Sequence, residues 1–370
     1  MKVRIAFDSQ TFCNQSYGGI SRYFVRLAEQ LIFRNHDVCI FAPLHRNRYV
    51  KDLSSGIVQG YGLNNYMPKT SRLMFLLNHF LSRIAIKHWQ PQIVHETYYS
   101  TIGSAPKDCP TVITVYDMIH ELFEKQFSSR DHTSRLKKIS VKRADHIICI
   151  SESTRQDLIQ LLGVDEKKVS VVYLGFEKFS TDSKKQKKIS AINKPYLFFV
   201  GDRGNYKNFL RFIHAIGSSK RLKNEFNIIC FGGGRFVSSE LAIFSELGFK
   251  KDQVIHKEGD DILLGECYDH ATAFVYPSLY EGFGLPPLEA MAHNCPVISS
   301  NTSSMPEIIG DAAEFFDPKS IEDISASIER VVYSPNRTNT LIKQGEKRLT
   351  NYSWELCATQ TLQIYSSLCG

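Results

Sequence analysis

The sequence predicts an α/β protein made of two doubly wound, parallel-sheet domains. The chain has 370 residues, more than a single domain usually contains. Short apolar runs alternate with loops and amphipathic segments along its length, which is the pattern of repeated β-loop-α units. A polar, lysine-rich segment over residues 181–194 has no core periodicity and separates two such series.

These observations predict four parts of the chain. We expect a first domain over residues 1–178, a linker over 179–194 and a second domain over 195–350. The last part, 351–370, contains a helix that begins at Trp354 and has no strand after it. We expect this helix to brace the two domains.

Composition narrows the class of protein. Hydrophobic residues make up 43% of the chain and charged residues 22%, so we expect a globular rather than a disordered protein. The apolar run at the N-terminus is too short for a signal peptide, and no run approaches the about twenty apolar residues of a membrane span. Nine scattered cysteines without a Cys-x-x-Cys pair indicate buried free thiols in a reducing compartment. The sequence therefore predicts a cytoplasmic protein.

The net charge of +7 is concentrated in the first half of the chain. Residues 1–178 contain 24 basic and 16 acidic residues, residues 179–194 contain five and one, and the remainder contains 16 and 21. A basic first domain suits an anionic membrane surface, a nucleic acid or an acidic glycan, and an ordinary solvated surface explains it equally well.

In the first domain, apolar runs predict strands at 3–7, 38–42, 93–96, 111–116, 146–150 and 169–174. The pair Gly18-Gly19 opens a helix and is similar to a phosphate-approach loop, although a plain turn explains it equally well. After the strand at 111–116 come Asp117 and His120, at the strand end where open α/β sheets contact ligands.

Residues 71–89 predict a long amphipathic helix. Its apolar positions are 73, 76, 77, 80, 81, 84 and 85, and it also carries Arg72, Arg83, Lys87 and His88. Packing of the apolar stripe against the core is the ordinary explanation of this pattern. Attachment to a membrane surface is the alternative.

The second domain begins with a strand at 196–200, a glycine loop at 201–208 and a helix. The same order recurs from residues 227 and 273, and the strand at 296–300 leads to another loop and helix start. Arg203 and Lys207 lie in the first loop, close to a helix start, where cations and helix N–H groups suit an anion. The alternative is a pair of solvated cations.

The most structured motif lies at 276–291. Gly282 and Gly284 allow a tight turn, and two prolines then preset the first turn of a helix. A helix N-terminus presents N–H groups without intrahelical partners, which suits a phosphate. Glu281 precedes this turn and Glu289 follows it on the helix, so we expect the two carboxylates to reach one ligand from different sides.

Helix starts, cations and carboxylates together suit a nucleotide sugar. Cations and backbone amides stabilise a diphosphate, and carboxylates accept hydrogen bonds from sugar and ribose hydroxyls. The sequence has no Asp-x-Asp, so we expect no metal at the diphosphate, with Arg203 and Lys207 in its place. We expect no other cofactor.

These motifs resemble those of retaining glycosyltransferases with the GT-B architecture, in family four of the sequence-based classification. Residues 281–289 have the family's Glu-x7-Glu form with Gly-Phe-Gly-Leu-Pro inside. Residues 201–208 resemble its diphosphate loop, and 18–22 its N-terminal glycine loop. The resemblance covers most of the chain and implies two Rossmann-like domains facing a cleft.

The resemblance also implies roles for individual residues. Glu281 would contact the sugar hydroxyls as a catalytic residue, and Glu289 would hold the ribose. The remaining donor contacts would come from Gly19, Arg203, Lys207 and the backbone of Phe283, Gly284 and Leu285.

One position departs from the family pattern. Many relatives have His-Asp where this chain has Tyr116-Asp117, so an imidazole at 116 is missing. Asp117 is a candidate for a catalytic contact with the acceptor or the sugar, and His120 for an acceptor contact. Structural hydrogen bonds at the sheet end explain both residues equally well.

The resulting hypothesis is a cytoplasmic hexosyltransferase of bacterial surface-polysaccharide synthesis (O-antigen, capsule or lipopolysaccharide), with mannose favoured. A GDP- or UDP-linked sugar is the expected donor, and a glycan or lipid-linked glycan the acceptor. The acceptor hydroxyl would attack on the face that the diphosphate leaves, and the diphosphate would take its proton.

A lipid-linked acceptor would bring the basic first domain to the anionic inner membrane, and we expect no nucleic-acid partner. Two alternatives remain at this point: a nucleotide-sugar 2-epimerase of the same architecture, and a non-catalytic nucleotide-sugar binding protein.

Overall fold

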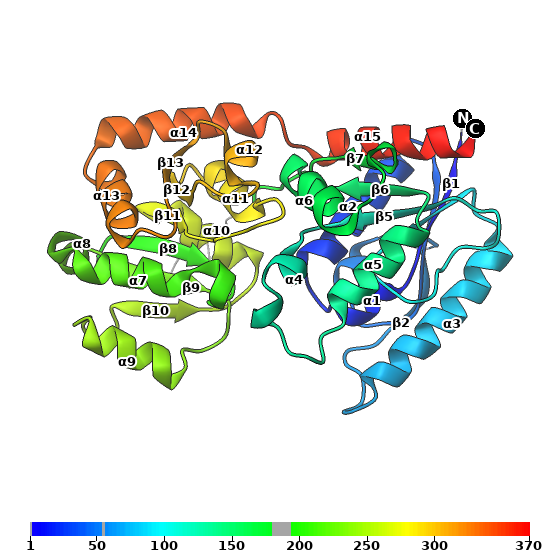
Figure 1. Ribbon diagram of the computed structural model, residues 1–370, viewed down its shortest axis with the longest axis horizontal. Coiled ribbons are helices and arrows are strands. Elements are labelled where there is room, and N and C mark those ends of the chain that lie inside the picture. Colours follow the sequence, from blue (N-terminus) through cyan, green and yellow to red (C-terminus); the bar gives the residue numbers. More distant parts are fainter. Residues whose placement is uncertain (1, 54–55, 180–193) are drawn as a thin grey trace. The chain divides into compact units, whose positions relative to one another are not determined.

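A computed structural model of the chain describes residues 2–53, 56–179 and 194–370 (Figure 1). The chain forms two compact units: unit 1 contains residues 1–175 and 353–370, and unit 2 contains residues 176–352. The predicted linker, 179–194, lies outside the described residues except for its two end residues. Each unit is a parallel sheet with helices on both faces, which confirms the predicted α/β class.

Unit 1 contains a seven-stranded sheet in the order β3-β2-β1-β4-β5-β6-β7. All neighbouring strands are parallel. The strands are β1 (Arg4–Phe7), β2 (Asp37–His45), β3 (Val58–Gly62), β4 (Ile93–Glu96), β5 (Thr111–Val115), β6 (His146–Cys149) and β7 (Val169–Val171).

Helices cover both faces of this sheet. Alternate strand residues face opposite sides, so Ala6 packs in the cluster with Ile86 of α3 (Ser71–Trp89), whereas Phe7 contacts Phe24 of α2 (Gly19–Phe33). The helices of unit 1 are α1 (Gln10–Asn14), α2 (Gly19–Phe33), α3 (Ser71–Trp89), α4 (Ile119–Leu122), α5 (Thr133–Arg143), α6 (Glu152–Leu162) and α15 (Trp354–Cys369).

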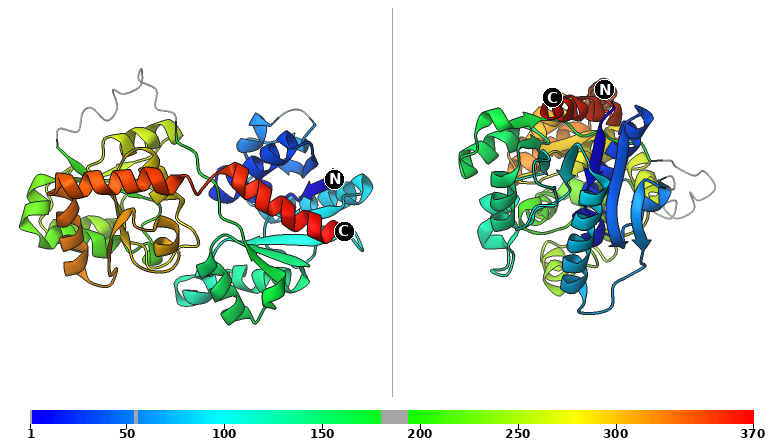
Figure 2. Two further views of the ribbon diagram at one scale, coloured as in Figure 1. Left: turned by 90° about the horizontal axis from the view of Figure 1, so that it is seen from above. Right: turned by 90° about the vertical axis from the view of Figure 1, so that its right-hand side faces the viewer.

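The C-terminal helix α15 packs on α2 and β4 and belongs to unit 1 (Figure 2). His95 of β4 joins it to the sheet, because the His95 ring nitrogens lie 2.5 Å from the Tyr365 hydroxyl and 2.8 Å from the Thr114 hydroxyl. The predicted start at Trp354 is confirmed. A role of this helix in bracing the two units stays a prediction.

Unit 2 contains a six-stranded parallel sheet in the order β10-β9-β8-β11-β12-β13. Its strands are β8 (Tyr196–Val200), β9 (Asn227–Phe231), β10 (Val254–Lys257), β11 (Ala273–Tyr276), β12 (Val297–Ser300) and β13 (Ala313–Phe316). Its helices are α7 (Phe209–Ser218), α8 (Lys220–Glu225), α9 (Ser238–Glu246), α10 (Asp261–Asp269), α11 (Leu285–Ala292), α12 (Met305–Ile309), α13 (Ile321–Val332) and α14 (Pro335–Leu349).

The strand order fixes where a ligand site can form. In unit 2 the chain runs outward from β8 to β10 and then returns to β11 on the other side of β8. In unit 1 it does the same around β1, with β4 on the returning side. Loops diverge at the carboxyl ends of such neighbouring strands, and the crevice between them is where open α/β sheets bind ligands.

The nine cysteines are free, as the sequence predicts. Seven are buried, and Cys109 and Cys369 are half-buried. Across the described ranges, no helix is long and apolar enough to cross a membrane.

Candidate functional site

Two loops meet at the crevice of unit 2. β8 pairs with β11 through Leu197–Ala273 and Phe198–Phe274, so the loops that follow the two strands leave the same edge of the sheet side by side. The first loop, 201–208, ends in a short turn over Asn205–Lys207. The second, 277–284, leads into α11. The structure therefore brings together the two motifs that the sequence singled out.

Lys207 and Glu281 form an ion pair between these loops, with 2.7 Å from Nζ to Oε1. Burial lowers the pKa of the Lys207 ammonium, but the charge and hydrogen bond of Glu281 outweigh this effect, and the pKa is raised above its ordinary value. Lys207 therefore remains a cation at neutral pH. Its ammonium also lies 5.7 Å from the centre of the Tyr276 ring.

The loop that carries Glu281 is held by side chains from two other loops. The Ser304 hydroxyl donates to the Glu281 carbonyl over 2.8 Å, and the Glu281 amide donates to the Ser303 hydroxyl over 3.0 Å. Asn208 is buried and donates to the carbonyls of Pro277, over 3.0 Å, and Pro318, over 2.7 Å. The position of the Glu281 carboxylate is thus fixed by the backbone as well as by Lys207.

Helix α11 begins at this loop. Gly284, its N-cap residue, has φ +102°, a conformation that costs a residue with a β-carbon free energy. Leu285 is the first helical residue and two prolines follow, so the first turn has few N–H groups and Leu285 supplies one of them. The Phe283 ring is buried against Tyr352, with centroids 5.7 Å apart.

Glu289 lies one turn into α11 and is buried. The buried Tyr268 hydroxyl donates to its Oε2 over 3.3 Å. Burial, and then the Glu289 charge, raise the pKa of the Tyr268 hydroxyl well above its ordinary value, so it stays a donor. The Tyr268 hydroxyl therefore orients the Glu289 carboxylate, although Tyr268 was not singled out from the sequence.

Arg203 is engaged within its own unit. Its Nε lies 2.7 Å from Oε1 of Glu240, and its two terminal nitrogens donate to the carbonyls of Gly232, over 3.2 Å, and Arg235, over 3.0 Å. The guanidinium therefore fastens the loop after β9 to the loop after β8. A contact of Arg203 with a diphosphate stays a prediction.

In unit 1 the glycine pair opens α2, as the sequence predicts, with Gly18 as N-cap and Gly19 as the first helical residue. A β-carbon on Gly18 would lie 2.3 Å from Oε1 of Gln15, so this position has no room for another residue unless Gln15 moves. A β-carbon on Gly19 would meet nothing within 4 Å. The backbone at Gly19 therefore has open space on the side where a β-carbon would lie.

Asp117 follows β5 and accepts a hydrogen bond from the Ile119 amide over 3.0 Å. The buried Lys137 of α5 donates to the Asp117 carbonyl over 2.7 Å and lies 2.6 Å from a Glu121 carboxylate oxygen. This network holds the chain after β5 in place, and Lys137 was not singled out from the sequence. These hydrogen bonds of Asp117 are structural, and a role of Asp117 in a reaction stays a prediction.

His120 lies in the same segment. Its Nε2 is 3.4 Å from Asp131, and its ring stacks on Phe127 with centroids 4.1 Å apart. Tyr116 is buried and donates to the Thr97 carbonyl over 3.4 Å, which agrees with a structural place for this residue.

A buried acidic pair, Asp8 and Glu96, lies at the carboxyl ends of β1 and β4 and was not singled out from the sequence. Asp8 accepts hydrogen bonds from the hydroxyls of Thr97, over 2.6 Å, and Ser104, over 2.7 Å. Glu96 pairs with Arg143 at 2.5 Å. Burial, and then the Asp8 charge, raise the pKa of Glu96 to about 7. An acidic residue that ends a buried strand was the signal available in the sequence.

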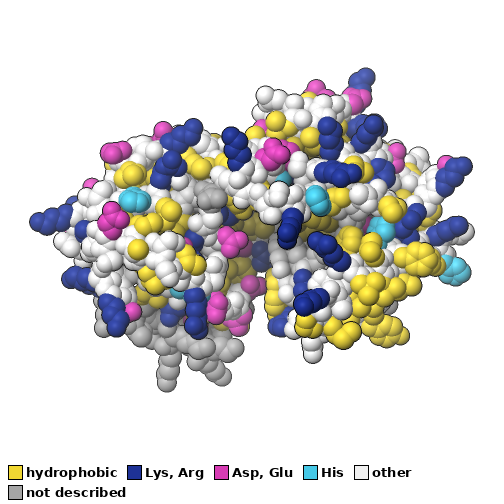
Figure 3. Space-filling view, turned by 60° about the horizontal axis from the view of Figure 1, so that its bottom comes forward, with side chains coloured by type: hydrophobic (Ala, Val, Ile, Leu, Met, Phe, Trp, Pro, Cys, Tyr) yellow, Lys and Arg dark blue, Asp and Glu magenta, His cyan; other side chains and the backbone are white. Residues whose placement is uncertain are grey.

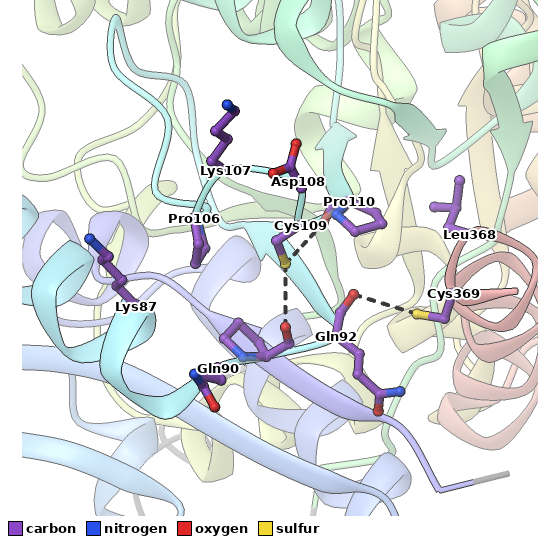
Figure 4. A pocket seen from close by; sticks show the side chains of 11 residues that line it. Lys87, Gln90, Gln92, Pro106, Lys107, Asp108, Cys109, Pro110, Leu368 and Cys369 are labelled. Carbon is purple, nitrogen blue, oxygen red and sulfur yellow. Dashed lines mark hydrogen bonds between the residues drawn. The ribbon is translucent and has the colours of Figure 1, made fainter.

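A cavity of about 600 Å³ lies at the opposite edge of unit 1 (Figure 4). Its lining includes Gln92 and Cys109, which precede β4 and β5, and Cys369 at the end of α15. The two thiols donate to backbone carbonyls of Pro91 and Gln92. This cavity is thus at the amino ends of the strands, away from the residues predicted to act.

Among the described residues, no group of three or more His, Cys, Asp or Glu side chains could hold a metal ion. The site in unit 2 instead offers a fixed ammonium at Lys207, a helix N-terminus at Leu285 and two oriented carboxylates, Glu281 and Glu289. Such a set can bind an anion and several hydroxyl groups.

Two family models, one for each half, together match most of the chain. Residues 17–177 match the model described as Glycosyltransferase Family 4, and residues 180–348 match the model described as Glycosyl transferases group 1. The boundary between the two matches falls close to the boundary between unit 1 and unit 2.

Curated relatives and solved structures agree with these matches. O-antigen chain mannosyltransferase RfbU of Salmonella typhimurium strain LT2 is 28% identical over 307 residues, which span 81% of this chain and 83% of that protein. O-antigen chain mannosyltransferase B of Escherichia coli is 44% identical over 101 residues, 27% of this chain and 26% of that protein.

The crystal structure of Anabaena Alr3699/HepE in complex with UDP and glucose is similar to this fold. Its TM-score is 0.75 at 15% identity, and the match covers 99% of this chain and 100% of that chain. At this identity the likeness concerns the fold.

Proposed function

Because the chain belongs to the group 1 glycosyl transferases of glycosyltransferase family 4, which have the GT-B fold, we propose that it transfers mannose to a bacterial surface polysaccharide. The donor is a nucleotide-diphosphate sugar. The acceptor is a glycan or a lipid-linked glycan. The names of two relatives, both O-antigen chain mannosyltransferases, support this choice of sugar and pathway.

The observation that carries the proposal is the Lys207–Glu281 pair, 2.7 Å apart at the start of α11. A permanent cation beside a helix N-terminus suits the diphosphate of a donor. A carboxylate on the same spot suits the hydroxyls of the attached sugar. A nucleotide sugar carries an anionic diphosphate and hydroxyl groups within a few ångströms of each other, and so fits this pair.

In the proposed donor complex, Lys207, Arg203 and the backbone of residues 283–285 hold the diphosphate. Glu281 accepts hydrogen bonds from the sugar, and Glu289 accepts them from the ribose. As the bond between sugar and diphosphate breaks, negative charge grows on the leaving oxygen. The raised pKa of Lys207 keeps its ammonium charged to stabilise that oxygen.

Unit 1 would supply the acceptor site. Asp117 and His120 lie after β5, and the glycine pair lies after β1, at the same carboxyl edge of the sheet. In the proposed reaction, Asp117 orients the acceptor hydroxyl or the sugar, His120 contacts the acceptor, and the Gly19 backbone approaches the donor.

The proposed transfer keeps the anomeric configuration of the donor and needs no metal or other cofactor. The acceptor hydroxyl attacks on the face that the diphosphate leaves, and the diphosphate oxygen takes the hydroxyl proton. No side chain is needed as a general base. The cations at 203 and 207 carry the electrostatic task that a metal would perform.

A lipid-linked acceptor implies a place for the reaction. We propose a cytoplasmic enzyme that attaches peripherally to the inner membrane when it meets this acceptor. The excess of basic residues in residues 1–178 supports contact with an anionic surface.

A panel of ligands tests the proposal. Thermal unfolding is measured with GDP, UDP, ADP and their sugar conjugates, each at a concentration far above its expected dissociation constant. A ligand at about a hundred times its Kd stabilises the bound unit by about 2.7 kcal/mol, which raises Tm by several degrees. One nucleotide series should give this shift, and Lys207→Ala should abolish it.

The ligands that raise Tm are then incubated with and without a glycan acceptor. Transfer that requires the acceptor is the expected result. Conversion of the donor sugar without acceptor would indicate a 2-epimerase, and binding without either reaction would indicate a non-catalytic binding protein. The absence of a shift with every nucleotide would contradict the proposal.

A further inference from the structure

The helix α3 (Ser71–Trp89) is amphipathic, but polar residues lie on its buried side and most of its apolar stripe faces solvent. Its buried residues include Asn78 and Ser82, whereas Leu73, Leu76 and Phe80 are exposed at 61%, 65% and 61%. The sequence pattern had core packing as its ordinary explanation. The structure contradicts that explanation for most of the stripe.

Hydrogen bonds explain why the polar side faces inward. The Asn78 amide oxygen accepts from the Leu44 amide over 2.6 Å, and its nitrogen donates to the Leu44 carbonyl over 3.0 Å. These bonds satisfy the backbone of β2 where the helix crosses it. With the polar side used in this way, the apolar side is left facing solvent.

The exposed residues form one continuous stripe, which we name the α3 stripe. They recur at helical spacing and therefore lie on one side of the helix. Figure 3 shows hydrophobic side chains gathered over a face of the molecule with Lys and Arg side chains around it. The α3 stripe consists of Leu73, Leu76, Leu77, Phe80, Leu81 and Ile84.

The segment of the chain that carries the α3 stripe has charges of one sign. Residues 53–95 contain four Lys or Arg residues and no Asp or Glu. All four, Lys69, Arg72, Arg83 and Lys87, are exposed. An apolar stripe whose own segment of the chain carries cations and no carboxylate matches a bilayer whose headgroups are anionic.

A second copy of the chain suits this face less well. A twofold contact would place the same four cations of each copy against one another, at a cost in electrostatic repulsion. Anionic lipid, in contrast, complements the cations while its acyl chains cover the leucines. The charge pattern therefore favours lipid as the occupant.

We propose that α3 is a membrane-docking helix that lies in the plane of an anionic bilayer, with the α3 stripe inserted below the headgroups. The four cations bind the headgroups around it. This inference rests on the proposed function only for the acceptor, which would be lipid-linked; the docking itself depends on α3 alone.

The test is co-sedimentation of the full chain with vesicles of phosphatidylcholine and phosphatidylglycerol, at low salt. The variant Leu76→Ser/Phe80→Ser should bind at least about tenfold more weakly, because two large apolar side chains no longer enter the acyl layer. The variant Arg72→Gln/Arg83→Gln/Lys87→Gln should lose about fivefold per charge removed. All five positions are exposed, so these variants should keep their fold.

Matched controls change the same chemistry elsewhere. Leu161→Ser/Leu241→Ser removes two exposed leucines outside α3, and Lys138→Gln/Lys142→Gln/Lys168→Gln removes three exposed cations of unit 1. Both control variants should bind vesicles within about twofold of the unchanged chain. Equal losses in the control and the α3 variants would overturn the proposal.

Three further readouts separate the outcomes. Vesicles of phosphatidylcholine alone, or high salt, should weaken binding. Light scattering tests for a dimer. If the chain were a dimer, and Leu76→Ser/Phe80→Ser made it a monomer without changing vesicle binding, the stripe would be a contact between two copies. That result would overturn the docking proposal. Donor hydrolysis without vesicles should be equal in all variants. Hydrolysis without vesicle binding would refute this inference and the proposed peripheral attachment, and would leave the proposed transfer reaction standing.

Discussion

At the scale of single residues, the site depends on the ion pair of Lys207 and Glu281. The two side chains come from loops that are more than seventy positions apart in sequence and meet at 2.7 Å. Each partner is largely buried, so removal of either leaves the other without its counter-charge. Loss of function and loss of stability must therefore be separated in any test of this pair.

Lys207→Ala and Glu281→Ala should each reduce sugar transfer at least about tenfold, as the loss of a charged hydrogen bond of about 1.5–3 kcal/mol implies. Steady-state kinetics with the donor from the ligand panel measures this effect. Glu281→Gln keeps the shape of the side chain, and Lys220→Ala removes an exposed lysine of the same unit as a control.

If either alanine variant retained full transfer activity, the site assignment would be wrong. If Glu281→Gln lost as much activity as Glu281→Ala while Tm stayed unchanged, the carboxylate charge itself would be the part that acts. A fall in Tm with unchanged kcat/KM would indicate a structural pair only.

Much of the candidate site in unit 2 could be predicted at this scale because its residues lie in glycine loops and at a helix start in the sequence. Lys207, Glu281 and Glu289 all carry such local signals. The residues that orient them do not. Ser303 and Tyr268 reach the site only through the packing of other strands and helices. No spacing in the sequence predicts their contacts with Glu281 and Glu289.

At the scale of elements, the start of α11 determines the geometry of the loop over residues 277–284, which we propose to bind the donor. Gly284 has φ +102°, and a β-carbon there would lie no closer than 3.8 Å to any neighbour. An alanine would thus fit sterically and would suffer only from the backbone conformation. The helix start would shift to relieve that strain.

Gly284→Ala should destabilise unit 2 by about 1–2 kcal/mol and lower affinity for nucleoside diphosphates. Gly248→Ala is the matched control, because Gly248 also has a positive φ, +70°, and belongs to the same unit. Calorimetric titration measures affinity, and thermal unfolding measures the cost in stability. Equal loss of affinity in both variants would show that α11 has no special part in binding.

The elements that the sequence did not predict are strands at the edges of the two sheets. β3 forms one edge of the first sheet, and β10 and β13 form both edges of the second. Edge strands are less covered by helices, so their apolar pattern is weak: β3 is Val-Gln-Gly-Tyr-Gly, with only its first residue half-buried. The central strands are buried on both faces and were predicted from their apolar runs.

His95 links the central strand β4 to α15, and its environment gives unit 1 a pH dependence. Burial lowers the pKa of the His95 ring to about 3. The folded unit therefore favours the neutral ring, and this contribution is complete above the ordinary pKa of about 6.5 and is lost as pH falls below it. The free energy of unfolding should decrease on acidification.

Between pH 7 and pH 5 this group should lower the stability of unit 1 by about 2 kcal/mol relative to His95→Gln, which cannot titrate. Tryptophan fluorescence in urea measures it, because the two tryptophans, Trp89 and Trp354, both belong to unit 1. A difference between unchanged chain and variant that did not vary with pH would refute this account of His95.

At the scale of the whole molecule, two parallel-sheet units were predictable because β-loop-α repeats and a lysine-rich break are visible in the sequence. What could not be predicted is which face of a helix meets the core. In α3 the hydrogen bonds of Asn78 to β2 decide this, and they turn the leucines outward. Hydrophobic periodicity predicts that a helix has an apolar stripe, but it does not predict whether the stripe faces the core of the protein or solvent.

In the proposed reaction the chain transfers a sugar from a nucleotide-diphosphate donor with retention of configuration. The measurement that tests it most directly is proton NMR of the product formed from the matching nucleotide-mannose and a glycan acceptor, with a metal chelator present. We expect an acceptor-dependent product whose new linkage has the anomeric configuration of the donor. A product of inverted configuration, or mannose released but never joined to any acceptor, would contradict it.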